Sequence, residues 1–414
     1  MAHPFWTYCA QVLAFDLGRE RPEQTPGAGL DKKRLQALRA ASRPGVSCVA
    51  LLGLGLGELA RDLAGRASPE CAFTAVELDP AKARRLIASG ALPWLGEDGP
   101  ARLIADASPW AAGFLLRLAG DLGNAPLIML NPELGEAEKS RYQSLRRFLA
   151  GRAGAAGAPL PGQTEPRPRL TLAAIVRPGE PELADFFDGV RDIAGDLVLV
   201  WDGATLPEEA RSLAIPEGAI QLARPLCDDF AAQRNAMLAA CPDGAVLSLD
   251  ADERVSPGLR LALPELARLA QYDGVYLPRL TLAPGEERVL CGYGLWPDPQ
   301  LRLFRKTPGA RYVRPVHERL EGLPGATAVA PAAPIIHLNH VLKSPEAWAD
   351  KLARFDAASG GRLAHRLGRE YPSLPREFFD DLVRRTPPAA LWTVAAPAVM
   401  TESAESADSV NSAS

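Results

Sequence analysis

Short apolar runs separated by helical segments organise the first 150 residues. The runs cover residues 46–52, 72–78, 102–105 and 127–130. They are apolar throughout rather than alternating, as in strands buried on both faces of a parallel sheet. Asp79 and Pro80 follow the second run, where they can cap and open a helix. The pattern predicts an α/β, Rossmann-like domain over residues 1–150, with a doubly wound sheet.

A second alternation of strands and helices follows a break in this pattern. Residues 151–169 are rich in Gly, Ala and Pro without periodicity, which indicates an interdomain linker. Apolar runs then recur with helical segments between them, at 170–176, 197–201, 219–223 and 245–249. We expect a second Rossmann-like domain over 170–360, a helical extension over 361–400 and a disordered polar tail over 401–414.

The bulk composition argues against several classes of protein. Lys and Arg number 46 and Asp and Glu 50, a net charge of −4, without the basic stripe that nucleic-acid binders carry. The six cysteines form no close pair, which argues against a zinc site or disulfide framework and fits a reducing cytoplasm. The first residues lack the basic region and apolar core of a signal peptide, and no apolar stretch of about 20 residues occurs, so we expect neither a signal peptide nor a transmembrane segment. We expect a cytoplasmic protein, with peripheral contact to the inner face of the membrane left open.

Three carboxylates lie just after the apolar run 245–249. Asp250, Asp252 and Glu253 would concentrate negative charge at the carboxyl edge of the sheet, where open α/β folds bind ligands. Hard oxygen ligands suit Mg²⁺ or Mn²⁺, so a divalent metal with a diphosphate is the natural partner. The alternative is a solvated loop in which one carboxylate caps the next helix. An Asp-x-Asp pair alone does not decide between the two.

The surrounding sequence resembles a known family over about residues 170–356. Residues 228–257, DDFAAQRNAMLAACPDGAVLSLDADERVSP, combine a D-F-A-x-x-R-N helix, an apolar strand and a D-A-D-E loop. Three more stretches match in order and spacing, PDPQLRLFRK at 297–306, VHERL at 316–320 and PIIHLNHVLKSPEAWADKLARF at 334–355. The region is similar to the family 2 glycosyltransferases of GT-A fold, particularly the subgroup containing lipopolysaccharide-core β-1,4-glucosyltransferases. The resemblance implies a GT-A nucleotide-diphospho-sugar transferase domain.

The resemblance also implies roles for individual residues. It makes Asp252 the metal ligand and Glu318 the candidate general base, which takes a proton from the acceptor hydroxyl. Four residues would lie at the nucleotide sugar: Asp202 at the uracil or ribose, Arg234 and Asn235 at the nucleotide or sugar edge, and Asp250 at the ribose or donor sugar. Arg302 and Arg305 would bind the diphosphate or anionic acceptor groups through their planar guanidinium groups.

Several of these assignments have a plainer alternative. Asp202 would simply begin a turn, and Arg234 would be an ordinary charge on a helix surface. Arg302 and Arg305 would lie on the exposed face of a strand, with the alternate leucines pointing inward.

Three histidines and two departures from the family pattern leave parts of the site open. His317 is a candidate metal ligand, proton shuttle or turn residue. One of His337 and His340 would either complete the metal site or form a structural hydrogen bond. The family's Asn-Glu pair is missing after Val176, and Asp202 begins DGATLP where the family has D-x-x-S-T-D-x-T. Both departures lie in the nucleotide-binding half, so the base of the donor stays open, with UDP-sugar favoured.

A glycine loop in the first domain indicates a second candidate ligand site. Gly53, Gly55 and Gly57 lie between a strand and a helix. Glycine there permits a tight turn close to a ligand, and the helix N-terminus favours negative groups. Glu77 ends the next strand, about where an acidic residue would bind a ribose diol.

This glycine loop has two interpretations. Segment 46–131 resembles the S-adenosylmethionine-dependent methyltransferases, which implies Asp106 at the adenine side and S-adenosylmethionine as cofactor. Leu51, however, stands where an acidic residue usually precedes the first glycine. The stretch LNPEL at 130–134 also resembles the N-terminal part of motility-associated flagellin glycosyltransferases, which need not methylate anything. We favour an accessory domain over a working methyltransferase.

Together these patterns predict an inverting glycosyltransferase dependent on Mg²⁺ or Mn²⁺. It would move a sugar from a nucleotide diphosphate sugar to a glycan, a lipopolysaccharide core or a protein acceptor. One alternative is a bifunctional protein with an additional methyltransferase activity in residues 1–150. The other is a non-catalytic scaffold that binds glycans.

Overall fold

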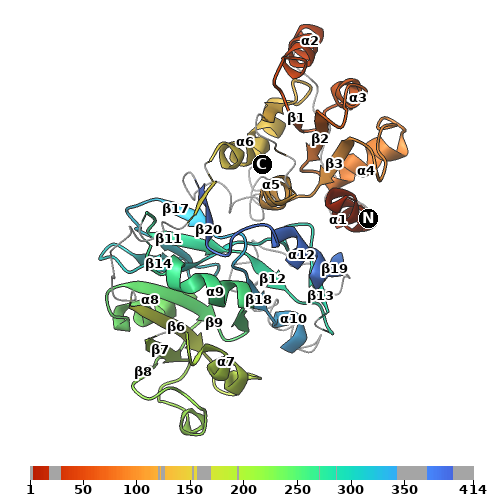
Figure 1. Ribbon diagram of the computed structural model, residues 1–414. Helices are drawn as coiled ribbons and strands as arrows, with labels where there is room; N and C mark the ends of the chain where they lie inside the picture. The colour runs from red at the N-terminus through yellow and green to blue at the C-terminus, as the bar shows by residue number, and fades with distance from the viewer. Residues whose placement is uncertain are drawn as a thin grey trace, which may run out of the picture.

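The protein has an α/β architecture with two main β-sheets. The computed structural model describes residues 3–17, 29–119, 122, 126–151, 153–155, 169–193, 195–269, 271–285, 287–342 and 371–394. Figure 1 shows the N-terminal part, in red to yellow, stacked on the part that begins at residue 170. The predicted α/β class is confirmed.

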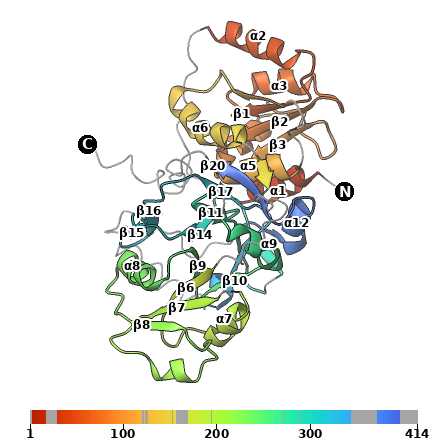
Figure 2. The ribbon, with the colours of Figure 1, turned by 60° about the vertical axis from the view of Figure 1, so that its left-hand side comes forward.

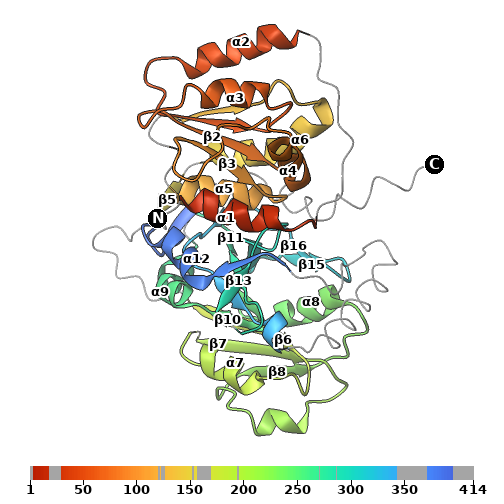
Figure 3. The same cartoon turned by 90° about the vertical axis from the view of Figure 1, so that its right-hand side faces the viewer.

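The N-terminal part is built on a four-stranded parallel sheet in the order β3-β2-β1-β4. Its strands are β1 (Cys48–Leu52), β2 (Ala72–Glu77), β3 (Ala101–Ala105) and β4 (Pro126–Leu130). Its helices are α1 (Pro4–Ala14), α2 (Leu30–Ala41), α3 (Glu58–Ala64), α4 (Pro80–Ala88), α5 (Pro109–Leu118) and α6 (Glu136–Ala150). Figure 3 shows α3 on one face of this sheet and α1 with α5 on the other. The predicted parallel sheet is confirmed, and β1 is buried along its whole length because both faces are covered.

The second sheet has nine strands in the order β5-β20-β17-β11-β14-β9-β6-β7-β8. Its parallel half consists of β6 (Leu170–Val176), β7 (Asp196–Trp201), β8 (Ile220–Ala223) and β9 (Ala245–Asp250). Its mixed half consists of β14 (Gln300–Arg305), β11 (Gly274–Leu277), β17 (Thr327–Val329), β20 (Ala390–Val394) and β5 (Ala153–Ala155). β14 runs antiparallel to β9, so the second part is a mixed sheet rather than a wholly parallel one.

Helices and three small sheets surround this large sheet. The helices are α7 (Leu183–Val190), the 3-10 helix η1 (Glu208–Arg211), α8 (Phe230–Ala240), α9 (Pro257–Leu266), α10 (Asn339–Leu342) and α12 (Arg376–Val383). One small sheet has the order β10 (Glu253–Val255), β18 (Ile335–His337), β12 (Arg279–Thr281). The others pair β13 (Arg288–Leu290) with β19 (Ser373–Pro375) and β15 (Arg311–Val313) with β16 (Arg319–Glu321).

The strand order creates a switch point beside β6. From β6 the chain proceeds to β7 and β8 on one side, then returns to place β9 on the other side. Ile175 near the end of β6 lies opposite Asp250 at the end of β9. Open α/β sheets bind ligands outside the carboxyl ends of their strands at such a point. The acidic cluster therefore lies at the expected ligand-binding edge.

Aromatic packing joins the N-terminal part to the second sheet. The ring of Trp392 in β20 lies 5.1 Å from Phe114 in α5 and 5.9 Å from Phe148 in α6, measured between ring centroids. Figure 2 shows β20 next to α5. Arg117 donates to the carbonyl oxygens of Phe148 and Gly151, each at 2.7 Å, and so satisfies the end of α6. A single hydrophobic core therefore extends across both parts.

The described residues cover the predicted linker and the predicted helical extension only in part, and the predicted tail not at all. Within the predicted linker, residues 153–155 form β5, which pairs with β20. The sequence predicts a helical extension over 361–400, whereas its described part, 371–394, forms β19, α12 and β20. The predicted tail 401–414 lies outside the described residues. Among the helices of the described ranges, none has the length and hydropathy needed to cross a membrane.

Candidate functional site

The end of β9 forms a tight acidic turn. Glu253 is fully buried, and its Oε2 accepts the backbone N–H of Asp250 at 3.0 Å. Ser256 then caps α9, accepting the N–H of Leu259 at 3.1 Å, and Pro257 occupies the first turn of that helix. The turn is therefore fixed at both ends, and it does not form the solvated loop of the plainer alternative.

Two buried arginines bind the carboxylate of Asp250. Arg234 Nη2 from α8 lies 2.5 Å from Oδ1, and Arg302 Nη2 from β14 donates to Oδ2. Burial alone would raise the pKa of Asp250, but the two guanidinium groups hold it well below its usual range. Asp250 is therefore an ionised carboxylate neutralised by the protein itself, and its predicted contact with a sugar stays a prediction.

Arg234 also binds Glu318, the candidate general base. Its Nε lies 2.5 Å from Glu318 Oε1, and its Nη1 donates to Ser248 Oγ at 3.2 Å. The side chain of Arg234 is only 3% exposed. The alternative of a helix-surface charge is wrong, because this guanidinium is buried and bridges two carboxylates. Its predicted place at the nucleotide or sugar edge stays a prediction.

Asn235 is engaged with backbone rather than directed at a ligand. Its Nδ2 donates to the Tyr312 carbonyl and its Oδ1 accepts the Tyr312 N–H, each at 2.8 Å. These two bonds attach α8 to β15, the strand that precedes the Glu318 loop. The structure gives Asn235 this structural role, and its predicted position at the nucleotide or sugar edge stays a prediction.

Arg302 and Arg305 lie in very different surroundings. Arg302 is buried, and besides Asp250 its Nη2 contacts Glu253 Oε1 at 2.7 Å. It therefore neutralises carboxylates of the chain, and the alternative of an exposed strand face is wrong for it. Arg305 pairs with Ala245 at the start of β9, the end opposite Asp250. It donates to the Leu269 carbonyl at 2.7 Å and does not contact the acidic turn, and its predicted contact with a diphosphate or an anionic acceptor group stays a prediction.

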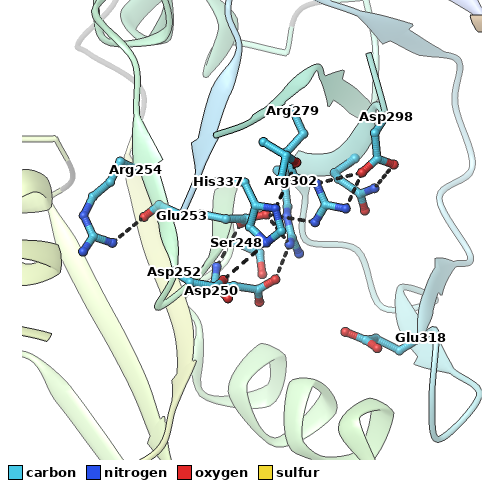
Figure 4. Close-up of polar contacts among 12 residues, drawn as sticks. Ser248, Asp250, Asp252, Glu253, Arg254, Arg279, Asp298, Arg302, Glu318 and His337 are labelled. Atoms are coloured by element: carbon cyan, nitrogen blue, oxygen red, sulfur yellow. Dashed lines mark hydrogen bonds and ion pairs between the residues drawn. The ribbon is translucent and has the colours of Figure 1, made fainter. Parts of the chain in front are cut away.

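Asp252 and His337 lie close together beside the turn. Strand β10 pairs with β18, so that Glu253 lies opposite His337, and His337 Nε2 is 3.8 Å from Asp252 Oδ1. The other ring nitrogen, Nδ1, is 3.1 Å from Thr281 Oγ1, which fixes the ring. Figure 4 shows His337 above Asp250 and Asp252, with Glu318 to one side. The structure thus brings together one predicted metal ligand and one of the two candidate histidines.

This donor set fits a cation that arrives with a diphosphate. Within the described ranges, no three His, Cys, Asp or Glu side chains form a metal-binding group, so His317 does not complete one with Asp252 and His337. Mg²⁺ is typically held by one or two carboxylates, with substrate phosphates and waters as the other ligands. One carboxylate and one imidazole match that mode rather than a cage made entirely of protein ligands.

Loops with strained backbone surround the edge of the sheet. Asp202 follows β7, and its Oδ1 accepts the N–H of Leu226 at 2.8 Å, which ties this strand end to the loop before α8. In that loop Asp228 has φ +56°, and His317 in the loop beside it has φ +54°. Phe230 N–H bonds to the Pro315 carbonyl at 2.8 Å and joins the two loops. Left-handed backbone at non-glycine residues often marks functional sites.

In the N-terminal part, the glycine loop is filled by the chain itself. Glu133 is buried, and its two carboxylate oxygens accept the N–H groups of Leu56 and Leu59, each at 2.8 Å. Arg34 from α2 closes over it, with Nε 2.8 Å from Glu133 Oε1. A carboxylate therefore already occupies the anion-binding position at the start of α3. A Cβ on Gly55 would lie 2.4 Å from that of Glu133, which explains the glycine.

The other predicted cofactor residues are also buried and engaged. Glu77 accepts hydrogen bonds from the Leu54 N–H at 3.0 Å and from Tyr142 Oη at 2.9 Å. Asp106 accepts the Tyr8 hydroxyl at 2.6 Å. Because both side chains have zero exposure, neither one presents a surface to a ribose or an adenine. Gly53 and Gly57 have positive φ as a tight turn requires, but the turn packs against protein.

Comparison with known proteins leaves the family open. No family model matches the chain. A TPR repeat-containing protein of Synechococcus elongatus is 30% identical over 154 residues, which are 37% of this chain and 36% of that protein. The chain therefore spans little more than a third of the length of this curated relative.

Sequence reasoning missed several residues of the site. Ser248, Arg279 and Asp298 gave no separate signal, although Asp298 lies in the PDPQ stretch that carried the resemblance. Glu133 lies in the LNPEL stretch, which the sequence analysis used only for a resemblance. Its role in filling the glycine loop was not predicted.

Proposed function

We propose that the chain is an inverting glycosyltransferase. It would move a sugar from a nucleotide diphosphate sugar, with UDP-sugar favoured, to a hydroxyl of a glycan, lipopolysaccharide core or protein acceptor. The observation that carries this proposal is the meeting of Asp252 with His337 at the carboxyl end of β9. This end lies at the switch point of the parallel strands, where such sheets bind ligands.

The donor would lie along the carboxyl ends of β6, β7 and β9. Asp202 would contact the base or ribose, with its Oδ1 already fixed by the Leu226 N–H. Asp252 and His337 would hold a divalent cation together with the diphosphate of the donor. Such a cation supplies Lewis-acid stabilisation of the departing nucleoside diphosphate. Asp250 is already neutralised by arginines, so Asp252 is the carboxylate that best fits this role.

Glu318 is the proposed general base. Arg234 holds its Oε1, so Oε2 would take the proton of the acceptor hydroxyl. One guanidinium contacts both Glu318 and Asp250, which places the base beside the donor-side carboxylates. The acceptor would attack the anomeric carbon from the side opposite the leaving diphosphate, as inversion requires.

We propose an accessory role for the N-terminal part. The glycine loop, Glu77 and Asp106 are all bound by groups of the same chain, so no observation favours methyl transfer as a second function. Its extensive packing against β20 indicates a scaffold for the second sheet.

Thermal shift with a panel of nucleotide sugars tests the proposed function. A ligand that binds only the folded state raises the melting temperature with the logarithm of its concentration over Kd. We expect at least one UDP-sugar to raise it in Mn²⁺ and to do so much less in EDTA. The absence of any shift across UDP-, GDP-, CDP- and TDP-sugars would overturn the proposal. A purified protein that binds free glycans but never a donor would favour the scaffold instead.

A further inference from the structure

Carboxylates and guanidinium groups alternate along a continuous chain of seven side chains. In order they are Glu318, Arg234, Asp250, Arg302, Glu253, Arg279 and Asp298. Each comes from a different segment: α8, β9, β10, β12 and β14 supply five of them, and Glu318 and Asp298 lie in two separate loops. Figure 4 shows the part from Asp250 to Asp298 running behind the Asp252–His337 pair. Every charged group in this row of seven side chains therefore has an opposite charge on each side, except the two groups at its ends.

Glu253 lies near the centre of this chain and is its most buried member. Its side chain has zero exposure, against 9% for Arg302 and 21% for Arg279. Oε1 faces both arginines, at 2.7 Å from Arg302 Nη2 and 3.7 Å from Arg279 Nη1. A buried carboxylate is costly unless it is paired in this way. Arg279 is held in turn by Asp298, with Nε 2.8 Å from Oδ2.

The same Glu253 carboxylate also determines the backbone of the turn. Its Oε2 accepts the Asp250 N–H, which closes the turn over the two residues between them. Its backbone pairs β10 with β18 opposite His337, while the Asp252 carbonyl accepts the Leu338 N–H at 2.8 Å. Glu253 therefore connects Arg302 and Arg279 to the turn that carries Asp250 and Asp252 and to His337.

We propose that Glu253 is a positioning residue for the cation and diphosphate, and that Arg279 and Asp298 anchor it from behind. Glu253 itself would not bind the cation, because both its oxygens are used within the protein. Its charge keeps Arg302 between two carboxylates, so that Asp250 and the turn that carries Asp252 stay in place. This role rests on the proposed function, since the ligands being positioned are those of a nucleotide sugar.

The test compares the full chain with Glu253→Gln in Mn²⁺-dependent binding of UDP. The amide keeps an oxygen for the Asp250 N–H but removes the charge that Arg302 and Arg279 face. Loss of a group that orients metal ligands typically weakens metal affinity about 10- to 100-fold. We expect a weakening of that size in the Mn²⁺ titration, with much less change in the binding of UDP measured in EDTA. Glu265→Gln removes an exposed carboxylate from α9 and serves as the matched control.

Two outcomes separate this role from the proposed function. If the wild-type chain binds UDP with Mn²⁺ and Glu253→Gln binds both equally well, the positioning role is overturned and the glycosyltransferase proposal stands. If the wild-type chain binds no nucleoside diphosphate with Mn²⁺, both are overturned. Should Glu253→Gln fail to fold, Asp298→Asn at the more exposed end decides the question in the same titration. We expect Asp298→Asn to weaken Mn²⁺-dependent binding by about 3- to 10-fold, which is less than the loss of a direct orienting group causes. An unchanged affinity in this variant would overturn the role.

Discussion

Arg234 and Asp250 form an ion pair with 2.5 Å between Nη2 and Oδ1. Arg234 lies on the buried side of α8, and Asp250 ends the neighbouring strand β9. The same guanidinium reaches Glu318, which lies 84 residues further along the chain. The Arg-Asn pair of the D-F-A-x-x-R-N motif is therefore explained by construction of the site: Arg234 joins its carboxylates, and Asn235 attaches the strand that leads to Glu318.

Removal of this guanidinium should destabilise the protein strongly. Arg234→Met keeps most of the apolar volume but leaves Asp250 and Glu318 each without one of their charge partners. Breaking a buried ion pair from one side costs about 3–5 kcal/mol. Urea unfolding should show a loss of that size. Arg191→Met, which removes an exposed pair with Asp188, should cost less than about 1 kcal/mol. Equal losses for the two variants would contradict the burial of the Arg234 network.

The sequence predicted the elements better than their arrangement. Apolar runs and helix caps located strands such as β6 and β9 because both signals are local. The order of the strands and the antiparallel β14 depend on contacts between distant segments, which no local pattern encodes. Asp252 and the motif with Arg234 were noticed because their signals are local in sequence. The contact between Arg279 and Asp298 joins two segments and was therefore not predicted.

The first domain should not bind S-adenosylmethionine. Glu133 takes the amide donors of the glycine loop, and Glu77 and Asp106 are buried. Isothermal titration of the full chain should detect no binding at millimolar ligand. Saturable binding of S-adenosylmethionine would show that Glu133 gives way to a ligand and would restore the methyltransferase alternative.

Gly55 should be far less tolerant of alanine than Gly45. Both have positive φ, +59° and +88°, so each substitution costs about 1–2 kcal/mol from backbone conformation. A Cβ on Gly55 would also lie 2.4 Å from Glu133 Cβ, whereas one on Gly45 meets nothing within 4 Å. We expect Gly55→Ala to cost a further 1–3 kcal/mol, roughly, from overpacking. Similar unfolding free energies for the two variants would mean that Glu133 does not fill the loop.

Asp106 should make the stability of the chain depend on pH. Burial raises the pKa of its carboxyl from 3.8 to about 7, and the hydrogen bonds from Tyr8 and Ser108 only partly oppose this. The folded chain therefore holds this proton at pH values where the unfolded chain has released it. The resulting stability is fully present below pH 3.8 and is lost as the pH rises through about 7.

This dependence can be measured against Asp106→Asn. The free energy of unfolding of the wild-type chain, relative to the variant, should fall between pH 5 and pH 7 by up to about 1.4 kcal/mol per pH unit. The neighbouring Tyr8 and Cys9 do not contribute in this range, because burial raises the pKa of Cys9 to about 12 and that of Tyr8 well above 10. Parallel curves for the two proteins would contradict a buried, protonated Asp106.

The sequence alone could not decide the role of the first domain. Gly53, Gly55 and Glu77 have the sequence spacing of a cofactor site. In the structure the two glycines form a turn with positive φ, and Glu77 ends the neighbouring strand β2. What changes their role is Glu133, more than 70 residues away in sequence, which reaches the amides of Leu56 and Leu59. A carboxylate of the chain and the anion of a ligand satisfy the same amides, so a motif alone cannot distinguish them.

The most decisive measurement is release of nucleoside diphosphate from the UDP-sugar that gives the largest thermal shift, with wild-type chain and Asp252→Asn side by side. The proposed function predicts release that requires Mn²⁺ or Mg²⁺ in the wild type and falls at least ~100-fold in Asp252→Asn, since a ligand should matter no less than the groups that orient it. Asp243→Asn, an exposed aspartate on the turn before β9, should retain wild-type release. Release that is unaffected by both EDTA and Asp252→Asn would contradict the assignment of Asp252 and His337 as the cation site.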